Sequence, residues 1–99
     1  MTKTRPSLSV VSDRPTETVD LDFPVMIDGT EVSFLDMRRP TVRDQIIFED
    51  GKGSDARKVV KMLSNLCSVA EETIMDLDQS DFLKLSEVLQ GFQEPRQEN

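Results

Sequence analysis

The sequence predicts an α+β fold, in which an N-terminal β-hairpin is followed by a small bundle of about three helices. Apolar and polar side chains alternate over residues 19–27, which is typical of a half-buried strand. From residue 54 onward, apolar residues recur at spacings of three and four, which is typical of amphipathic helices. Strands followed by helices, rather than strands that alternate with helices, favour the α+β class.

The hairpin is expected over residues 19–38. Pro24 cannot donate a ladder hydrogen bond, so the first strand should lie at an edge or contain a break. Asp28 and Gly29 form a pair preferred in type I′ turns, because both central residues of that turn need positive φ. In the second strand the alternation shifts at Leu35, which predicts a bulge there. A hairpin alone is marginal in water, so we expect it to pack on the helices.

Helices are expected at about 41–49, 54–70 and 78–92. Each begins at a residue type that commonly caps helix N-termini; the three are Thr41, Ser54 and Asp78. Ser68 and Glu71 have the spacing of a capping box, which predicts a further turn of helix beginning there.

Residues 18–92 should therefore form a single domain. Residues 1–17 are rich in Ser, Thr and Pro and contain few apolar side chains, so we expect a flexible arm. The polar residues 93–99 are expected to be a disordered tail. The first residues carry charge without an apolar stretch behind it, so no signal peptide is expected.

Composition argues against most catalytic classes. The chain has 99 residues, a net charge of -7, no His and a single Cys. Without His there is no His-based acid–base catalysis, no Ser-His or Cys-His nucleophile, and hardly any way to build a zinc site. Its apolar stretches are far shorter than the ~20 residues that a membrane helix needs. We expect an acidic soluble protein that is not an enzyme and binds no cofactor and no membrane.

Charge is distributed unevenly along the chain. Residues 38–61 carry a net charge of +3, between an N-terminal part of -4 and a C-terminal part of -6. Nucleic-acid binding would need a basic domain with aromatic side chains for base stacking, so nucleic acid is not an expected partner. The basic segment is interpreted as a solvated helix face.

One weak metal pattern is present. Four residues have the spacing of positions 1, 3, 5 and 12 of an EF-hand calcium loop, namely Asp76, Asp78, Ser80 and Glu87. Asp81 stands where that loop needs Gly, and Lys84 would place a cation beside the ion. The alternative makes Asp78 an N-cap and Asp81 a favourable charge at the helix dipole. We therefore expect no metal site.

Two groups of residues are candidates for partner binding. Arg38, Arg39 and Pro40 lie at the junction of hairpin and helices, where the arginines would either clamp acidic groups of the chain or face a partner. The second group is the apolar stripe of the last helix, made of Leu85, Val88, Leu89 and Phe92. This stripe would either receive a helix of a partner protein or pack the hairpin.

The order of these features resembles a known family. Leu35 to Thr41 has the pattern Leu-x-x-Arg-Arg-Pro-Thr, and Leu77 to Asp81 has the pattern Leu-Asp-x-x-Asp before the last helix. With the proline-containing strand and the Asp-Gly turn, this order resembles the tail assembly chaperones of Mu-like and P2-like contractile-tailed phages and prophages. The resemblance covers about residues 19–92.

The resemblance implies a function. Such chaperones bind the tape-measure protein, a long helical and apolar chain, keep it soluble and assist the tail-tube subunits that polymerise around it. The resemblance further implies that the protein acts in the host bacterial cytoplasm, that it is absent from the mature virion, and that a longer frameshifted form of the chain exists. The exposed hairpin edge would allow self-association. The alternatives are a small acidic protein–protein adaptor and a degenerate calcium-binding regulator, both unrelated to phage tails.

Overall fold

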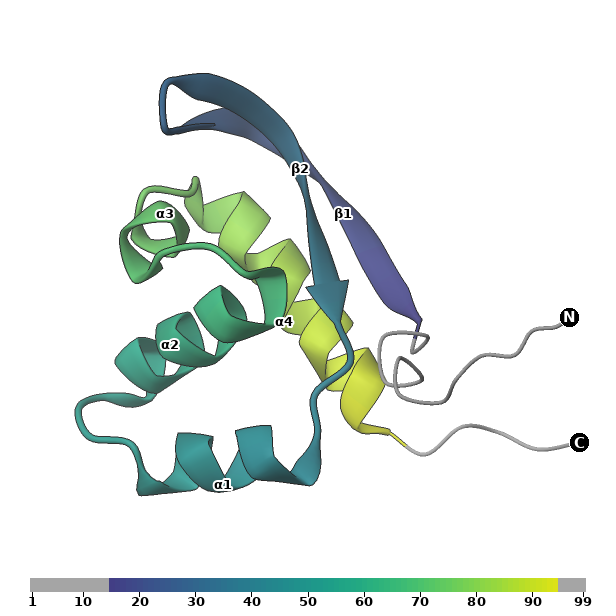
Figure 1. Cartoon of the computed structure of the whole chain (residues 1–99), viewed down its shortest axis with the longest axis vertical. Helices are drawn as coiled ribbons and strands as arrows, with labels where there is room; N and C mark the ends of the chain where they lie inside the picture. The colour runs from purple at the N-terminus through teal and green to yellow at the C-terminus, as the bar shows by residue number, and fades with distance from the viewer. Residues whose placement is uncertain (1–14, 95–99) are drawn as a thin grey trace, which may run out of the picture.

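A computed structural model describes residues 15–94 and confirms the α+β prediction, with an antiparallel hairpin followed by four helices in that part of the chain (Figure 1). The elements are β1 (Thr16–Ile27), β2 (Thr30–Arg38), α1 (Val42–Asp50), α2 (Asp55–Cys67), α3 (Glu71–Met75) and α4 (Gln79–Gln93). The hairpin runs along α4 toward α3, while α1 lies apart from it beside α2 (Figure 1). Strand β1 begins within the segment expected to be a flexible arm; residues 1–14 and 95–99 lie outside the described part.

Local side-chain chemistry begins the three longer helices as predicted. In each of these helices the N-cap side chain accepts a hydrogen bond from a backbone N–H of the first turn. The three N-cap residues are Thr41, Ser54 and Asp78. The capping box predicted at Ser68 is wrong. Ser68 ends α2 in the left-handed conformation, with φ of 58°, and α3 begins after Ala70 without a side-chain cap. A residue that closes one helix in this way is not in the extended conformation that an N-cap requires.

The hairpin turn has the predicted chemistry. Asp28 and Gly29 have φ values of 50° and 79°, so both central residues are in the left-handed region that a type I′ turn needs.

A large bulge lies in β1, not in β2. The strands pair in regular register from Thr16 to Asp20 and again from Val25 to Ile27, so residues 21–24 face the single residue Ser33. The bulge predicted at Leu35 is therefore wrong. The extra residues are in β1 and include Pro24, as expected for a residue that cannot donate to the ladder.

The carboxylate of Asp81 binds this bulge from α4. Its side chain is fully buried, and its two oxygens accept hydrogen bonds from the backbone N–H groups of Asp22 at 2.8 Å and Phe23 at 3.0 Å. Lys84 Nζ lies 3.6 Å from the same carboxylate and donates to Asp22 Oδ1 and the Asp20 carbonyl. Burial alone would raise the pKa of Asp81, but the two N–H donors and the charge of Lys84 lower it below its usual value. Asp81 thus joins α4 to β1.

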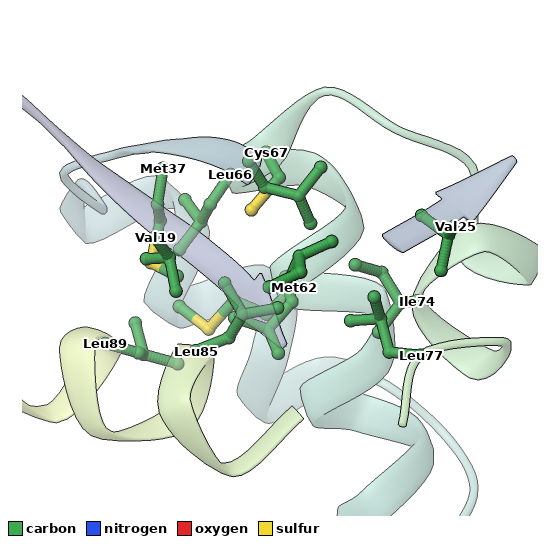
Figure 2. Packing of buried hydrophobic residues seen from close by; sticks show 13 residues of the cluster. Val19, Val25, Met37, Met62, Leu66, Cys67, Ile74, Leu77, Leu85 and Leu89 are labelled. Carbon is green, nitrogen blue, oxygen red and sulfur yellow. The ribbon is translucent and has the colours of Figure 1, made fainter. Parts of the chain in front are cut away.

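The hydrophobic core lies between the inner face of the hairpin and helices α2, α3 and α4. Figure 2 shows Val25 beside Ile74 and Leu77 at one end, and Val19 above Leu85 at the other. The buried apolar residues are Val19, Leu21, Val25, Leu35, Met37, Met62, Leu63, Leu66, Cys67, Ile74, Leu77, Leu85 and Leu89. None of them belongs to α1, which meets the core only through the half-buried Phe48.

Replacing Asp81 by Asn should lower the free energy of unfolding by about 2–3 kcal/mol, because one amide oxygen cannot accept from two divergent N–H donors in a buried site. Urea denaturation followed by circular dichroism measures this. Asp78→Asn is the matched control, because it removes the same charge while Asn caps helices as well as Asp, and it should change stability by less than about 0.5 kcal/mol. Equal urea midpoints for the two variants would contradict the role given to Asp81.

Candidate functional site

Arg38 clamps the first turn of α1. Its guanidinium makes two hydrogen bonds to the Asp44 carboxylate, Nη1–Oδ2 at 2.8 Å and Nη2–Oδ1 at 3.0 Å. Asp44 also accepts from the backbone N–H of Thr41 at 2.8 Å, which completes the capping box of α1. The Arg38 hydrogen bonds, helped by those from Thr41 and opposed by partial burial, lower the pKa of Asp44 to about 2. Of the two roles open to Arg38, the structure shows the intramolecular one.

Arg39 holds the other end of the same junction. Its guanidinium lies 4.9 Å from the centre of the Phe92 ring, and Nη2 donates to the Phe92 carbonyl oxygen at 3.1 Å. These contacts join the end of β2 to the last turn of α4. Pro40, which follows, is half-buried. Partner binding by these three residues stays a prediction, since both arginines already bind groups of the same chain.

The apolar stripe of α4 faces the hairpin. Leu85 is completely buried and Leu89 is buried in the core, while Val88 and Phe92 are half-buried against it. In this arrangement the stripe packs the hairpin, which is one of the two uses considered for it. Client binding through the stripe stays a prediction, and it would require Leu85 to leave the core.

Three of the four residues with calcium-loop spacing lie at helix ends. Asp76 ends α3, and Asp78 caps α4 while accepting hydrogen bonds from the N–H and hydroxyl of Ser80 at 3.0 and 2.7 Å. Glu87 is exposed on α4. The N-cap interpretation of Asp78 is confirmed. Within residues 15–94, no three acidic or Cys side chains are arranged so that they could hold a metal ion.

Cys67 lies in the core, as its position on the apolar face of α2 predicted. Burial, with a smaller contribution from the negative charge of Asp36, raises the pKa of the thiol to about 11. The thiolate is the reactive form, so the raised pKa leaves little reactive thiol in the folded chain near neutral pH.

A surface that sequence reasoning missed lies on α1. The helix has no buried residue, and Val42, Ile46 and Ile47 are 77%, 53% and 42% exposed. The consecutive apolar residues Ile46, Ile47 and Phe48 could have revealed it. Successive helical residues point in directions about 100° apart, so three in a row cannot all face one core.

Between α1 and α2 lies an open groove of about 440 Å³, which we call the α1–α2 groove. Its apolar lining consists of Ile47, Phe48 and Met62, and its basic lining of Lys52, Arg57, Lys58 and Lys61. Asp44, Asp50, Gly51 and Asn65 complete it. The basic segment interpreted as a solvated helix face thus borders a partly apolar hollow.

The part of the chain that the structure describes contains no helix of the length and apolar character needed to cross a membrane.

A model of the family of phage tail assembly chaperone proteins, described as E, or 41 or 14, matches residues 18–94. Comparison with curated proteins and with solved structures found no match. The matched range contains the hairpin from Thr18 onward and all four helices, and therefore the α1–α2 groove.

The pair of Arg38 and Asp44 predicts a loss of stability in acid. Folding lowers the Asp44 pKa from 3.8 to about 2. The Asp44 carboxylate is therefore protonated at a higher pH in the unfolded chain than in the folded chain. The stabilisation that the Arg38–Asp44 pair gives to the folded chain is complete above about pH 4 and is lost as the pH falls through about 2. Urea midpoints measured from about pH 5 to about pH 2 should fall less steeply for Arg38→Gln than for the unchanged chain. Arg43→Gln removes the same charge from an exposed position and should keep the full slope.

Cys67 should react slowly with a disulfide reagent such as dithionitrobenzoate. At about pH 8, a thiol pKa near 11 leaves on the order of 100-fold less thiolate than an unperturbed cysteine has. The folded chain should therefore react at least that much more slowly than the chain unfolded in urea. Similar rates in the two states would mean that the thiol is accessible.

Proposed function

Because this chain belongs to the phage tail assembly chaperone family, we propose that it is a non-enzymatic chaperone that binds the tape-measure protein, keeps it soluble and assists tail-tube assembly around it. The tail-tube subunits and a longer frameshifted form of the chain would be further partners. The protein would act in the host bacterial cytoplasm and be absent from the mature virion.

The observation that carries the proposal is the apolar surface of α1. Of the four large apolar residues of α1, only Phe48 packs against the core, whereas Val42, Ile46 and Ile47 remain exposed. Further large apolar side chains are exposed elsewhere, and they are Phe23, Met26, Phe34, Met75 and Leu83. Exposed apolar side chains that gather on one element are typical of interaction sites. A chaperone for an apolar chain needs such a surface, because covering apolar residues of the client is what prevents its aggregation.

Net charge supports the same proposal. The chain carries -7 overall, so each bound copy would add negative charge to a client that is otherwise poorly soluble. Mutual repulsion between such complexes opposes their aggregation. The combination of a small apolar surface and a strongly charged exterior is what a holding chaperone requires.

Membership of the family disfavours the alternative of an adaptor unrelated to phage tails. The calcium-regulator alternative also loses its main support, because Asp78 is used as a helix cap. Self-association through the exposed hairpin edge remains compatible with the proposed function.

The proposal is tested by expressing the tape-measure protein of the same genome with and without this chain and measuring the soluble, co-purifying fraction. Co-expression should raise the soluble fraction several-fold. Ile46→Asp should abolish most of the gain, because one lost apolar contact weakens binding by about 10-fold or more.

Leu83→Asp is the matched control. Leu83 is an exposed leucine on α4, with an exposed fraction of 56% against 53% for Ile46, so it tests the same change away from α1. Circular dichroism and urea midpoints establish that both variants fold. A tape-measure protein that stays equally insoluble with and without the chain would refute the chaperone proposal, and equal losses in both variants would refute the assignment to α1.

A further inference from the structure

We propose that the α1–α2 groove binds an amphipathic helical segment of the client, in which Asp or Glu residues flank the apolar side chains. This inference rests on the proposed function and adds the chemical class of the segment and its place on the chaperone.

The apolar part of the groove can receive side chains of the client. Ile47 and Phe48 of α1 and Met62 of α2 contribute the apolar lining, and Ile47 remains 42% exposed. The volume of about 440 Å³ lies within the range of about 300–1,000 Å³ that is usual for ligand pockets. A pliable methionine beside an aromatic ring also suits a site that must accept more than one apolar side chain.

Charge determines which segments fit. No carboxylate of residues 15–94 lies within ion-pair distance of Lys52, Arg57 or Lys61, and Lys58 packs over the Phe48 ring at 5.3 Å. Of the two carboxylates in the groove lining, Asp44 is neutralised by Arg38, and Asp50 is outnumbered by the four basic side chains. The groove therefore presents unneutralised positive charge on a molecule whose net charge is -7. An acidic segment is attracted here and repelled by the rest of the surface.

The backbone of the groove favours a helix over an extended segment. Most N–H and C=O groups of α1 and α2 are used within these helices, so the groove offers mainly side chains to a partner. An extended segment would leave its own backbone groups unpaired there, whereas a helix satisfies them internally. Helices bound in grooves present apolar residues at spacings of three and four, which suits a narrow apolar strip flanked by charge.

The first test uses a defined probe, a rhodamine-labelled helical peptide of Leu, Ala and Glu with leucines spaced four apart and glutamates beside them. Its control peptide has Lys at every Glu position. Fluorescence anisotropy with the full chain should show at least about tenfold tighter binding of the Glu peptide, and this preference should shrink with added salt. Equal binding of the two peptides, or no binding of the Glu peptide, would overturn the inference.

Groove variants locate the binding. Lys61→Glu should weaken binding of the Glu peptide about threefold, and Lys52→Glu with Lys61→Glu about tenfold, since both side chains are exposed and unpaired. Arg43→Glu makes the same charge change on α1 outside the groove and should alter binding less than about twofold. An equal effect of Arg43→Glu and Lys61→Glu would show a general charge effect and overturn the assignment to the groove.

A second test uses the complex with the client. A photo-reactive phenylalanine analogue at Ile47 should cross-link to segments of the co-expressed tape-measure protein that are rich in Asp and Glu, whereas the same analogue at Leu83 should not. Cross-links from Ile47 to basic segments, or to a second copy of the chain, would overturn the inference while leaving the solubility result untouched. Failure of co-expression to keep the client soluble would instead refute the proposed function.

Discussion

A buried carboxylate in the first turn of α4 holds the hairpin to the helices. Asp81 accepts from the two N–H groups that the β1 bulge leaves without ladder partners, so one side chain satisfies both donors and fixes where α4 meets β1. A two-stranded sheet is marginal by itself, so it depends on this attachment and on the core beneath it. Because Leu85 and Leu89 lie on the same helix, the position of Asp81 also places them against Val19 and its neighbours (Figure 2).

Two consecutive arginines connect the end of β2 to α1 and to the last turn of α4. Arg38 binds Asp44 in α1, and Arg39 binds the Phe92 carbonyl and ring at the end of α4. The end of β2 is thus tied to both helices by charge-assisted contacts in place of apolar burial. For α1 this has a direct consequence, because a helix held by its cap, by Arg38 and by the half-buried Phe48 does not have to bury Ile46 or Ile47. The same attachment that positions α1 leaves its apolar residues available.

Most features that depend on neighbours in sequence could be predicted, with the capping box at Ser68 as an exception, and features that depend on distant partners could not. Asp28-Gly29, the caps Thr41 and Ser54, and the apolar alternation act over a few residues, so the sequence contains their full cause. Pro24 also predicted a break in the first strand, but the burial of Asp81 arises from a contact between residues almost sixty positions apart. The local sequence indicates only that Asp81 is a favourable charge at the helix dipole. The N–H groups that bind it belong to distant residues, so neighbouring residues do not reveal them. The groove was missed for the same reason, since only the packing of α1 on α2 brings Phe48 and Met62 together.

Val42, Ile46 and Ile47 of α1 lie outside the core, and this separates two demands, folding and binding, that most small domains must meet with the same residues. In a domain of this size, a change in a binding residue usually changes stability as well, because nearly every apolar residue is needed for folding. Here the residues at positions 42, 46 and 47 are exposed and do not belong to the core. Under the proposed function, recognition of the client can change through these positions of α1 with little effect on the fold.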